Sequence, residues 1–164
     1  KYLFLVDCAM IFKNFAVKDF IWHQRRKMIY GVYDDRENSG RIIKAEFEPV
    51  KAWDEIKNEY HPNTRVIQRG WVKLKAIVTS DEDGPFIPSV YGIKPLDVLS
   101  GSEDALKVSR IFSYMEEFRQ QVNCGETIIV EGNLEEVKSS SGSFLQVTLT
   151  YCPRYYEQVL KVIH

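Results

Sequence analysis

Residues 127–151 read Thr127-Ile-Ile-Val-Glu-Gly-Asn-Leu-Glu-Glu-Val137, then the polar stretch Lys138-Ser-Ser-Ser-Gly-Ser143, then a run that ends Leu145-Gln-Val-Thr-Leu-Thr-Tyr151. In the last run apolar residues alternate with polar ones, which is the period of a half-buried strand. Gly132 lies inside the first strand, where a missing side chain lets a sheet bend or bulge. The pattern predicts a hairpin with a polar turn, bent as a small barrel requires.

The sequence on both sides of this hairpin predicts the other elements of a small barrel. Ser113 and Glu116 have the spacing of a capping box, and Gly125 is placed to end a helix, so a helix is expected between them. Strands are predicted at 71–79, 86–93 and 108–112, with a further strand closing the segment that ends at residue 163. Because Pro88 cannot donate to a strand ladder, the second of these strands is expected at an edge, followed by a loop over 94–106.

The first third of the chain shows mixed signals. Residues 19–30 predict a helix, the polar residues 34–40 a turn, residues 41–48 a strand, and residues 49–60 a second helix that begins at a proline. We therefore expect an α+β protein: an α/β segment with a basic helix over residues 1–65, then a small antiparallel OB-like β-barrel domain over residues 66–164. Small barrels of this type usually bind something, and they seldom carry catalytic groups of their own.

Composition limits the class of protein. The chain has 164 residues, 45% of them hydrophobic, which is enough to bury a full core. No run approaches the roughly 18 apolar residues of a membrane span, and the start lacks a signal-peptide pattern, so a cytoplasmic location and no membrane partner are expected. The cysteines Cys8, Cys124 and Cys152 are widely spaced and predict buried thiols, with neither a disulfide framework nor a metal site.

Charge is divided unevenly along the chain. Residues 1–75 hold 15 Lys and Arg against 10 Asp and Glu, whereas residues 76–164 hold 7 against 13. Affinity for phosphate backbones comes largely from Lys and Arg. If nucleic acid binds, the first half is expected to hold it, while the acidic second half suits a basic protein partner.

The main basic cluster, on the predicted helix over 19–30, contains His23, Arg25, Arg26 and Lys27. Guanidinium groups offer paired donors to phosphate oxygens, so the cluster is a candidate site for phosphate or nucleic acid. Consecutive residues spread over much of a helix's circumference, and a solvated or salt-bridged face explains the cluster equally well.

Two carboxylates, Glu46 and Glu48, share one face of the strand predicted at 41–48, and Asp7 ends an apolar run. Such carboxylates hold Mg²⁺ in phosphoryl-transfer enzymes, which makes the three residues candidate catalytic ligands. Lys44 beside them supports a purely structural reading, in which no cofactor is needed. The sequence contains no Ser-His-Asp order, Gly-rich phosphate loop or H-E-x-x-H motif.

The predicted barrel has its own aromatic and basic side chains, on which bases of a nucleic acid are able to stack. Packing of the rings at the barrel rim is the alternative. These candidates are Tyr91, Tyr114, Arg119, Arg154, Tyr155 and Tyr156.

Several short motifs together resemble archaeal proteins of the nucleotidyltransferase superfamily, those related to DNA polymerase beta, in the region downstream of their catalytic module. The motifs are Arg25-Arg26 before Gly31, Lys73-Leu-Lys-Ala-Ile-Val-Thr79, Ile87-Pro-Ser-Val-Tyr-Gly-Ile93, Ile111-Phe-Ser-Tyr114, Gln121 before Gly125-Glu126, Val130-Glu-Gly-Asn-Leu-Glu135, and Thr150 before Arg154. The resemblance covers about residues 20–163 and implies an accessory barrel joined to a nucleotidyl-transfer domain.

The chain departs from that family at the catalytic motif. The family carries a Gly-Ser turn, an Asp-x-Asp pair that holds Mg²⁺, and a third carboxylate on a later strand. Here Asp7 is followed by Cys8 and Ala9, and by resemblance only Glu46 occupies a ligand position. We expect a noncatalytic module that binds RNA, DNA or a nucleotide. The alternatives are an active Mg²⁺-dependent nucleotidyltransferase with ligands supplied from outside residues 1–164, and a barrel that binds another protein.

Overall fold

The structure is a computed structural model that describes residues 27, 30–46, 48–56, 63–140, 142–150, 154 and 157–163. The chain divides into two compact units, Lys1–Pro49 and Val50–His164. The boundary expected between residues 65 and 66 lies inside the second unit, at the start of its first strand. None of the helices among the described residues is long and apolar enough to cross a bilayer.

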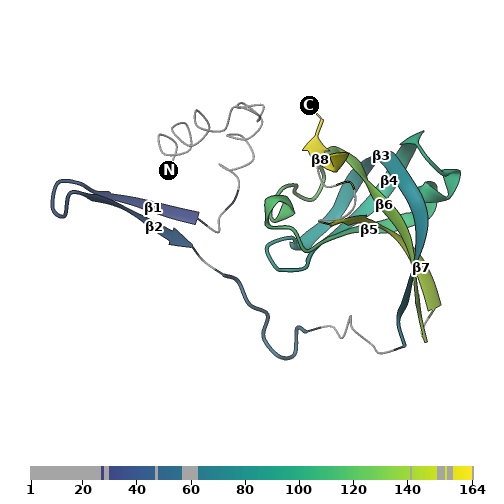
Figure 1. Ribbon diagram of the computed structural model, residues 1–164, viewed down its shortest axis with the longest axis horizontal. Coiled ribbons are helices and arrows are strands. Elements are labelled where there is room, and N and C mark those ends of the chain that lie inside the picture. Colours follow the sequence, from purple (N-terminus) through teal and green to yellow (C-terminus); the bar gives the residue numbers. More distant parts are fainter. Residues whose placement is uncertain are drawn as a thin grey trace. The chain divides into compact units, whose positions relative to one another are not determined.

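The described part of the first unit is an antiparallel hairpin of β1 (Tyr30–Asp35) and β2 (Arg41–Glu46), labelled in Figure 1. The polar turn between the strands forms as predicted, because the Asp35 carbonyl accepts hydrogen bonds from the amides of Asn38 and Ser39. The Arg36 guanidinium lies 2.6 Å from the Asp34 carboxylate. This contact holds the pKa of Asp34 below its ordinary value, mainly through the side-chain hydrogen bond from Arg36.

The described part of the second unit is built from strands and two short 3-10 turns. Its elements are β3 (Arg65–Asp83), β4 (Ser89–Ser100), η1 (Glu103–Lys107), β5 (Val108–Ser113), η2 (Glu116–Phe118), β6 (Thr127–Ser139), β7 (Gly142–Leu149) and β8 (Val159–Val162). The strands predicted at 71–79, 108–112 and 127–137 are confirmed, and β3 is much longer than expected. The strand predicted at 145–151 is confirmed up to Leu149, and Tyr151 lies outside the described residues.

The strands of this unit form a ring-like sheet. Neighbours pair in the order β3-β4-β5-β7-β6, and β6 pairs back with β3, so the sequence of pairings closes on itself. The β5–β7 pair is parallel and the other pairs are antiparallel. One edge of β6 is shared: β8 pairs with it from Ile128 to Glu131, and β7 pairs with it from Asn133 to Ser139.

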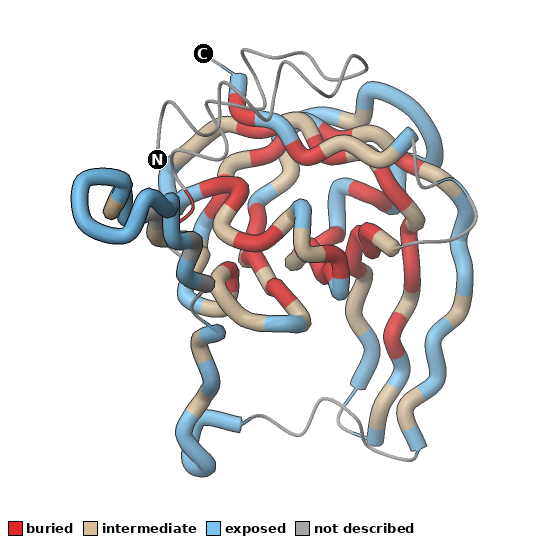
Figure 2. The backbone as a smooth tube through the Cα atoms, turned by 60° about the vertical axis from the view of Figure 1, so that its left-hand side comes forward, coloured by how far each residue is buried: buried red, intermediate tan, exposed pale blue. Residues whose placement is uncertain are grey.

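The core lies on the inner face of this ring, because alternate residues of each strand point to the same side. In Figure 2 the buried positions alternate with less buried ones along the strands. The inner residues include Val72, Leu74, Ala76 and Val78 of β3, Ile128, Val130 and Leu134 of β6, and Val147 and Leu149 of β7, all less than 2% exposed.

Gly132 allows β6 and β7 to approach each other closely. A Cβ atom at this position would lie 2.9 Å from the Thr148 carbonyl oxygen and 2.8 Å from Leu149 Cδ2. The β3–β6 register has no shift at Gly132, so the glycine is needed for close packing rather than for a bulge. It lies between the stretch of β6 that pairs with β8 and the stretch that pairs with β7.

The helix predicted from Ser113 to Gly125 is wrong, since only a 3-10 turn forms at Glu116–Phe118. The capping box does not assemble: the Ser113 hydroxyl accepts from the Met115 amide at 3.0 Å, while the Glu116 carboxylate pairs with Arg119 at 2.7 Å. The Arg119 side chain is fully buried and its Nε donates to the Pro85 carbonyl at 2.9 Å. These contacts compete with helix formation.

The helix predicted over 49–60 is also absent from its described part, residues 48–56. Val50 and Trp53 are 84% and 92% exposed, so the apolar face that was expected to stabilise this helix is not packed. The helix predicted over 19–30 lies outside the described residues, except for Lys27 and Tyr30, which begins β1. The described chain is therefore mostly β, and the α component of the predicted class is not found in it.

The prediction for the second strand of the ring, β4, was wrong in two respects. Pro88 lies just before β4, and β4 pairs with both β3 and β5, so the strand is not at an edge. The loop expected over 94–106 is instead the second half of β4 followed by η1. Pairing with β3 at Lys94, Pro95, Asp97 and Val98, through several register shifts, accommodates a proline that propensity alone would place in a loop.

Candidate functional site

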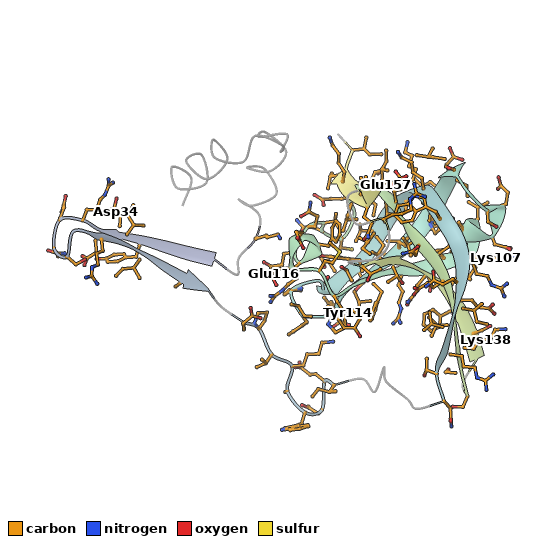
Figure 3. The ribbon with its side chains drawn as sticks, viewed as in Figure 1. Asp34, Lys107, Tyr114, Glu116, Lys138 and Glu157 are labelled. Atoms are coloured by element: carbon orange, nitrogen blue, oxygen red, sulfur yellow. The ribbon has the colours of Figure 1, made fainter. Side chains whose placement is uncertain are left out.

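A group of aromatic rings around one guanidinium lies on the outer face of β5 and β7. We call Arg110, Phe112, Tyr114 and Phe144 the platform. Arg110 and Phe112 pair with Gln146 and Thr148 of β7 and lie on the strand face opposite the core residue Ile111. On that face Arg110 is half-buried, and Phe112 is itself buried, with 9% of its surface exposed. Tyr114 follows the end of β5 and is 40% exposed (Figure 3).

The Arg110 guanidinium lies between two rings of the platform. Its Cζ atom is 4.5 Å from the centre of the Phe144 ring and 5.3 Å from the centre of the Phe112 ring. The Phe112 and Tyr114 rings meet edge to face, with centres 5.1 Å apart and an interplanar angle of 84°. Arg110, Phe112 and Phe144 are thus held in place by each other, whereas Tyr114 is the ring most open to solvent.

Beside the platform, a hydrogen-bond network joins the exposed Gln68 of β3 to buried polar side chains of β6 and β7. The Glu135 carboxylate accepts from Gln68 Nε2 at 2.6 Å, from Gln146 Nε2 at 3.0 Å and from the Thr148 hydroxyl at 2.5 Å. Gln146 Oε1 in turn accepts from Arg110 Nε at 2.9 Å. Gln146 donates to the Glu135 carboxylate and accepts from the Arg110 guanidinium, so the orientation of its amide is fixed. The same hydrogen bond fixes the orientation of the guanidinium.

A groove of about 690 Å³ adjoins the platform at one end of the ring. Its lining residues are Arg69, Ser102, Asp104, Lys107, Ser109, Leu134, Glu136, Ser143, Phe144 and Leu145. Phe144 therefore belongs to both the platform and the groove. Two ion pairs cross the lining: Arg69 pairs with Glu136, and Lys107 lies 2.7 Å from Asp104.

The two carboxylates of the groove are held in their ionised form. The side-chain hydrogen bond from Arg69 lowers the pKa of Glu136, and the one from Lys107 lowers the pKa of Asp104. Lys138 adds a second cation 3.3 Å from Glu136. The lining itself carries two cations and two anions, so the groove has no excess of either sign.

A separate cluster surrounds Trp71 on β3. The Arg154 guanidinium lies 4.2 Å from the Trp71 ring centre, and the indole N–H donates to Glu131 at 3.0 Å. Lys73 lies 3.0 Å from the same carboxylate. Partial burial would raise the pKa of Glu131, but the hydrogen bonds from Trp71 and Lys73 together outweigh it and leave the pKa below its ordinary value. Arg154 is also paired with Glu157.

The structure brings few of the predicted site residues together. Asp7, His23, Arg25, Arg26, Tyr155 and Tyr156 lie outside the described residues, as does the side chain of Glu46. Glu48 is exposed, and Lys27 is buried with 2% of its surface accessible. No group of three His, Cys, Asp or Glu side chains able to hold a metal ion occurs within the described ranges.

Two of the barrel side chains that were predicted to bind nucleic acid instead pack inside the protein. Arg119 is buried beneath the loop that contains Pro85, and Tyr91 is buried with its hydroxyl donating to the Phe118 carbonyl at 2.5 Å. Tyr114 and Arg154 are exposed at the surface. Cys124, predicted to be buried, is exposed, and its thiol donates to the Thr79 carbonyl at 3.3 Å.

The site residues predicted from the sequence do not include Arg110, Phe112 or Phe144. The alternation of Arg110 and Phe112 about Ile111 is a signal that was available, because it places both on one strand face. No local sequence signal predicts the position of Phe144, since its place beside Arg110 depends on the parallel pairing of β5 with β7.

Comparison with known proteins found one informative relative. The chain is 27% identical over 130 residues to an uncharacterised protein of the archaeon Methanocaldococcus jannaschii, MJ1086. The alignment covers 79% of this chain and 34% of the relative, so this chain corresponds to about a third of that protein. No family model matches the chain, and no solved structure matches it.

Proposed function

We propose that the second unit is an OB-like barrel that binds single-stranded nucleic acid on the platform, as a noncatalytic accessory module of a nucleotidyltransferase-like protein. The order of pairing supports the barrel: five strands close on themselves, and the third and fifth of them, β5 and β7, run parallel. Barrels of this class bind oligonucleotides and oligosaccharides on the face of their second and third strands, and β5, the third strand here, carries Arg110 and Phe112.

The arrangement of the platform carries the proposal. Bases of a single strand stack on aromatic side chains and on guanidinium planes, and this mode tolerates any sequence because each base has a π face. Tyr114, with 40% of its surface exposed, and the half-buried Phe144 and Arg110 provide such surfaces, while the buried Phe112 ring supports Arg110 and Tyr114 from below. The hydrogen bond from Arg110 to Gln146 fixes the guanidinium before a ligand arrives.

The charge around the platform limits the affinity. Residues 50–164 hold 16 Asp and Glu against 13 Lys and Arg, so the second unit carries a net negative charge, which opposes phosphate binding. Binding by the second unit is therefore expected to rest on stacking and to depend only weakly on salt. The cluster of Arg25 and Arg26 in the first unit remains the predicted source of phosphate contacts.

Replacement of the exposed ring tests the platform. Tyr114→Ala is expected to weaken binding of a fluorescein-labelled ten-nucleotide RNA by about 5- to 100-fold, since stacking on one ring contributes about 1–3 kcal/mol per base. Tyr33→Ala, at an aromatic residue of the first unit that is 61% exposed, is the matched control and is expected to leave the affinity unchanged. Fluorescence anisotropy measures both variants. Equal affinity of wild type and Tyr114→Ala would contradict the platform.

The noncatalytic role has its own test. The purified protein is incubated with Mg²⁺, labelled RNA and nucleoside triphosphates. Gel electrophoresis is expected to show no extended product, because the chain contains no Gly-Ser turn that leads into an Asp-x-Asp pair. Extension of the RNA that is lost in Glu46→Gln would favour the alternative, an active nucleotidyltransferase. Copurification of a basic protein without nucleic acid would instead favour a protein-interaction barrel.

A further inference from the structure

The groove at the end of the ring is continuous with the platform and differs from it in chemistry. Phe144 contributes to both, and Ser109 of the groove adjoins Arg110 of the platform in β5. Leu134, Phe144 and Leu145 give the groove an apolar part, and three serines add hydroxyl groups to its lining. Its volume of about 690 Å³ is in the range of sites that enclose one small molecule.

The charges of the groove disfavour a phosphate. Arg69 and Lys107 already pair with Glu136 and Asp104, and a phosphate that reached the two cations would also face the two carboxylates. Ionised carboxylates accept hydrogen bonds and donate none. A ligand that suits this lining therefore brings O–H or N–H donors together with an apolar ring face.

A ribonucleoside at the end of a strand has both properties. Its adjacent 2′ and 3′ hydroxyls are two donors that match the two oxygens of one carboxylate, and its base has a flat face that stacks on a phenyl ring. We propose that the groove receives the 3′-terminal nucleoside of an RNA strand bound on the platform, with the free diol at the Asp104 carboxylate and the base against Phe144. This inference rests on the function proposed above, and it adds a preference for RNA over DNA at the end of the strand.

The test compares three ten-nucleotide RNAs that differ only at the 3′ end and carry fluorescein at the 5′ end. One ends in the free diol, one in a 2′-deoxy nucleoside, and one in a 3′-phosphate. By fluorescence anisotropy the free diol is expected to bind about three- to tenfold more tightly than either of the others, the range that one or two hydrogen bonds contribute. The 3′-phosphate is expected to be the weakest, because it lies against carboxylates.

Asp104→Asn links this preference to the groove. The Asp104 side chain is 63% exposed in η1, so the substitution leaves the ring intact, which circular dichroism verifies. The variant is expected to lose most of the discrimination among the three RNAs. Asp97→Asn, at an exposed aspartate of β4 outside the groove, is the matched control and is expected to keep it.

The outcomes separate this inference from the proposed function. Equal binding of the three RNAs, with Tyr114→Ala still weakening each of them, would overturn the terminal site and leave the platform standing. Failure of any RNA to bind would overturn both. As a second measurement, adenosine is expected to shift the amide resonances of Ser143 and Phe144 in NMR spectra, and 2′,3′-dideoxyadenosine is expected to shift them less.

Discussion

At the scale of single residues, Glu135 is a buried charge that depends on several neighbouring side chains. It is 6% exposed, and its carboxylate accepts hydrogen bonds from Gln68, Gln146 and Thr148. A buried acceptor with three neutral donors depends on the donors being complete, because an unsatisfied buried group loses its hydration without compensation. The network therefore makes the platform sensitive to changes that do not touch its rings.

Glu135→Gln is expected to destabilise the protein by about 1–3 kcal/mol, because the new amide NH₂ group faces donors where the carboxylate accepted. Urea denaturation followed by circular dichroism measures the change. Glu82→Gln, at an exposed residue of β3, is the control and is expected to stay within about 0.5 kcal/mol of wild type. A stability of Glu135→Gln equal to the control's would mean that the network contributes little.

Glu131 is expected to make stability depend on pH. Its pKa is lower in the folded chain than in the unfolded chain, so its ionised form stabilises the fold above the unfolded pKa, and this contribution is lost as pH falls through the folded pKa. Glu131→Gln is expected to melt at a lower temperature than wild type at pH 7, with the gap closing below about pH 4. Melting curves from pH 7 to pH 3 measure it, and a constant gap would contradict the assignment.

Side-chain roles were predictable only where strand alternation decides them. Alternation alone separates Val147 and Leu149 of the core from Gln146 and Thr148 of the opposite face. It does not reveal that Arg119 is buried while Arg110 is partly exposed, because both depend on which loop or strand packs beside them.

At the scale of elements, Gly132 determines how closely β6 and β7 pack. Gly132→Ala is expected to destabilise the fold by about 1–3 kcal/mol, since the new methyl group would lie 2.9 Å from the Thr148 carbonyl oxygen and the backbone must shift. Thermal unfolding measures the change. Asn133→Ala, on the opposite face of the same strand, is the control with a smaller expected loss, and equal losses would argue against the close contact.

The predicted elements differ in how well local sequence determines them. The strands 108–112, 127–137 and 145–149 were found because alternation and turn residues agree. The helix after Ser113 was not, since Glu116 pairs with Arg119 and Met115 packs into the core instead of forming one face of a helix. Local signals were outweighed here by tertiary contacts.

At the scale of the whole molecule, the chain consists of two units, and the strand pairings of the ring lie entirely within Val50–His164. A fragment of residues 50–164 is therefore expected to fold by itself and unfold cooperatively, with dispersed amide resonances in NMR spectra. It is also expected to bind RNA with a smaller salt dependence than the full chain, because Arg25 and Arg26 are removed. An unfolded fragment would contradict the division into units.

The ring as a whole was only partly predictable. The number and order of strands after residue 66 follow from pattern, and the order suggested a closed sheet. The exact partners of each strand do not follow from pattern, because β5 and β7 are brought side by side by pairing across more than thirty intervening residues. The groove and the platform both depend on that pairing.

The parallel contact between β5 and β7 has a consequence for biosynthesis. A ribosome delivers β3, β4 and β5 first, and these three can form a meander as they emerge. The second edge of β5 then stays unpaired, so its backbone amides and carbonyls have no strand partner, until Leu149 has been translated and β7 can pair with it. Ring closure is thus a late event of synthesis, and the platform does not exist before it.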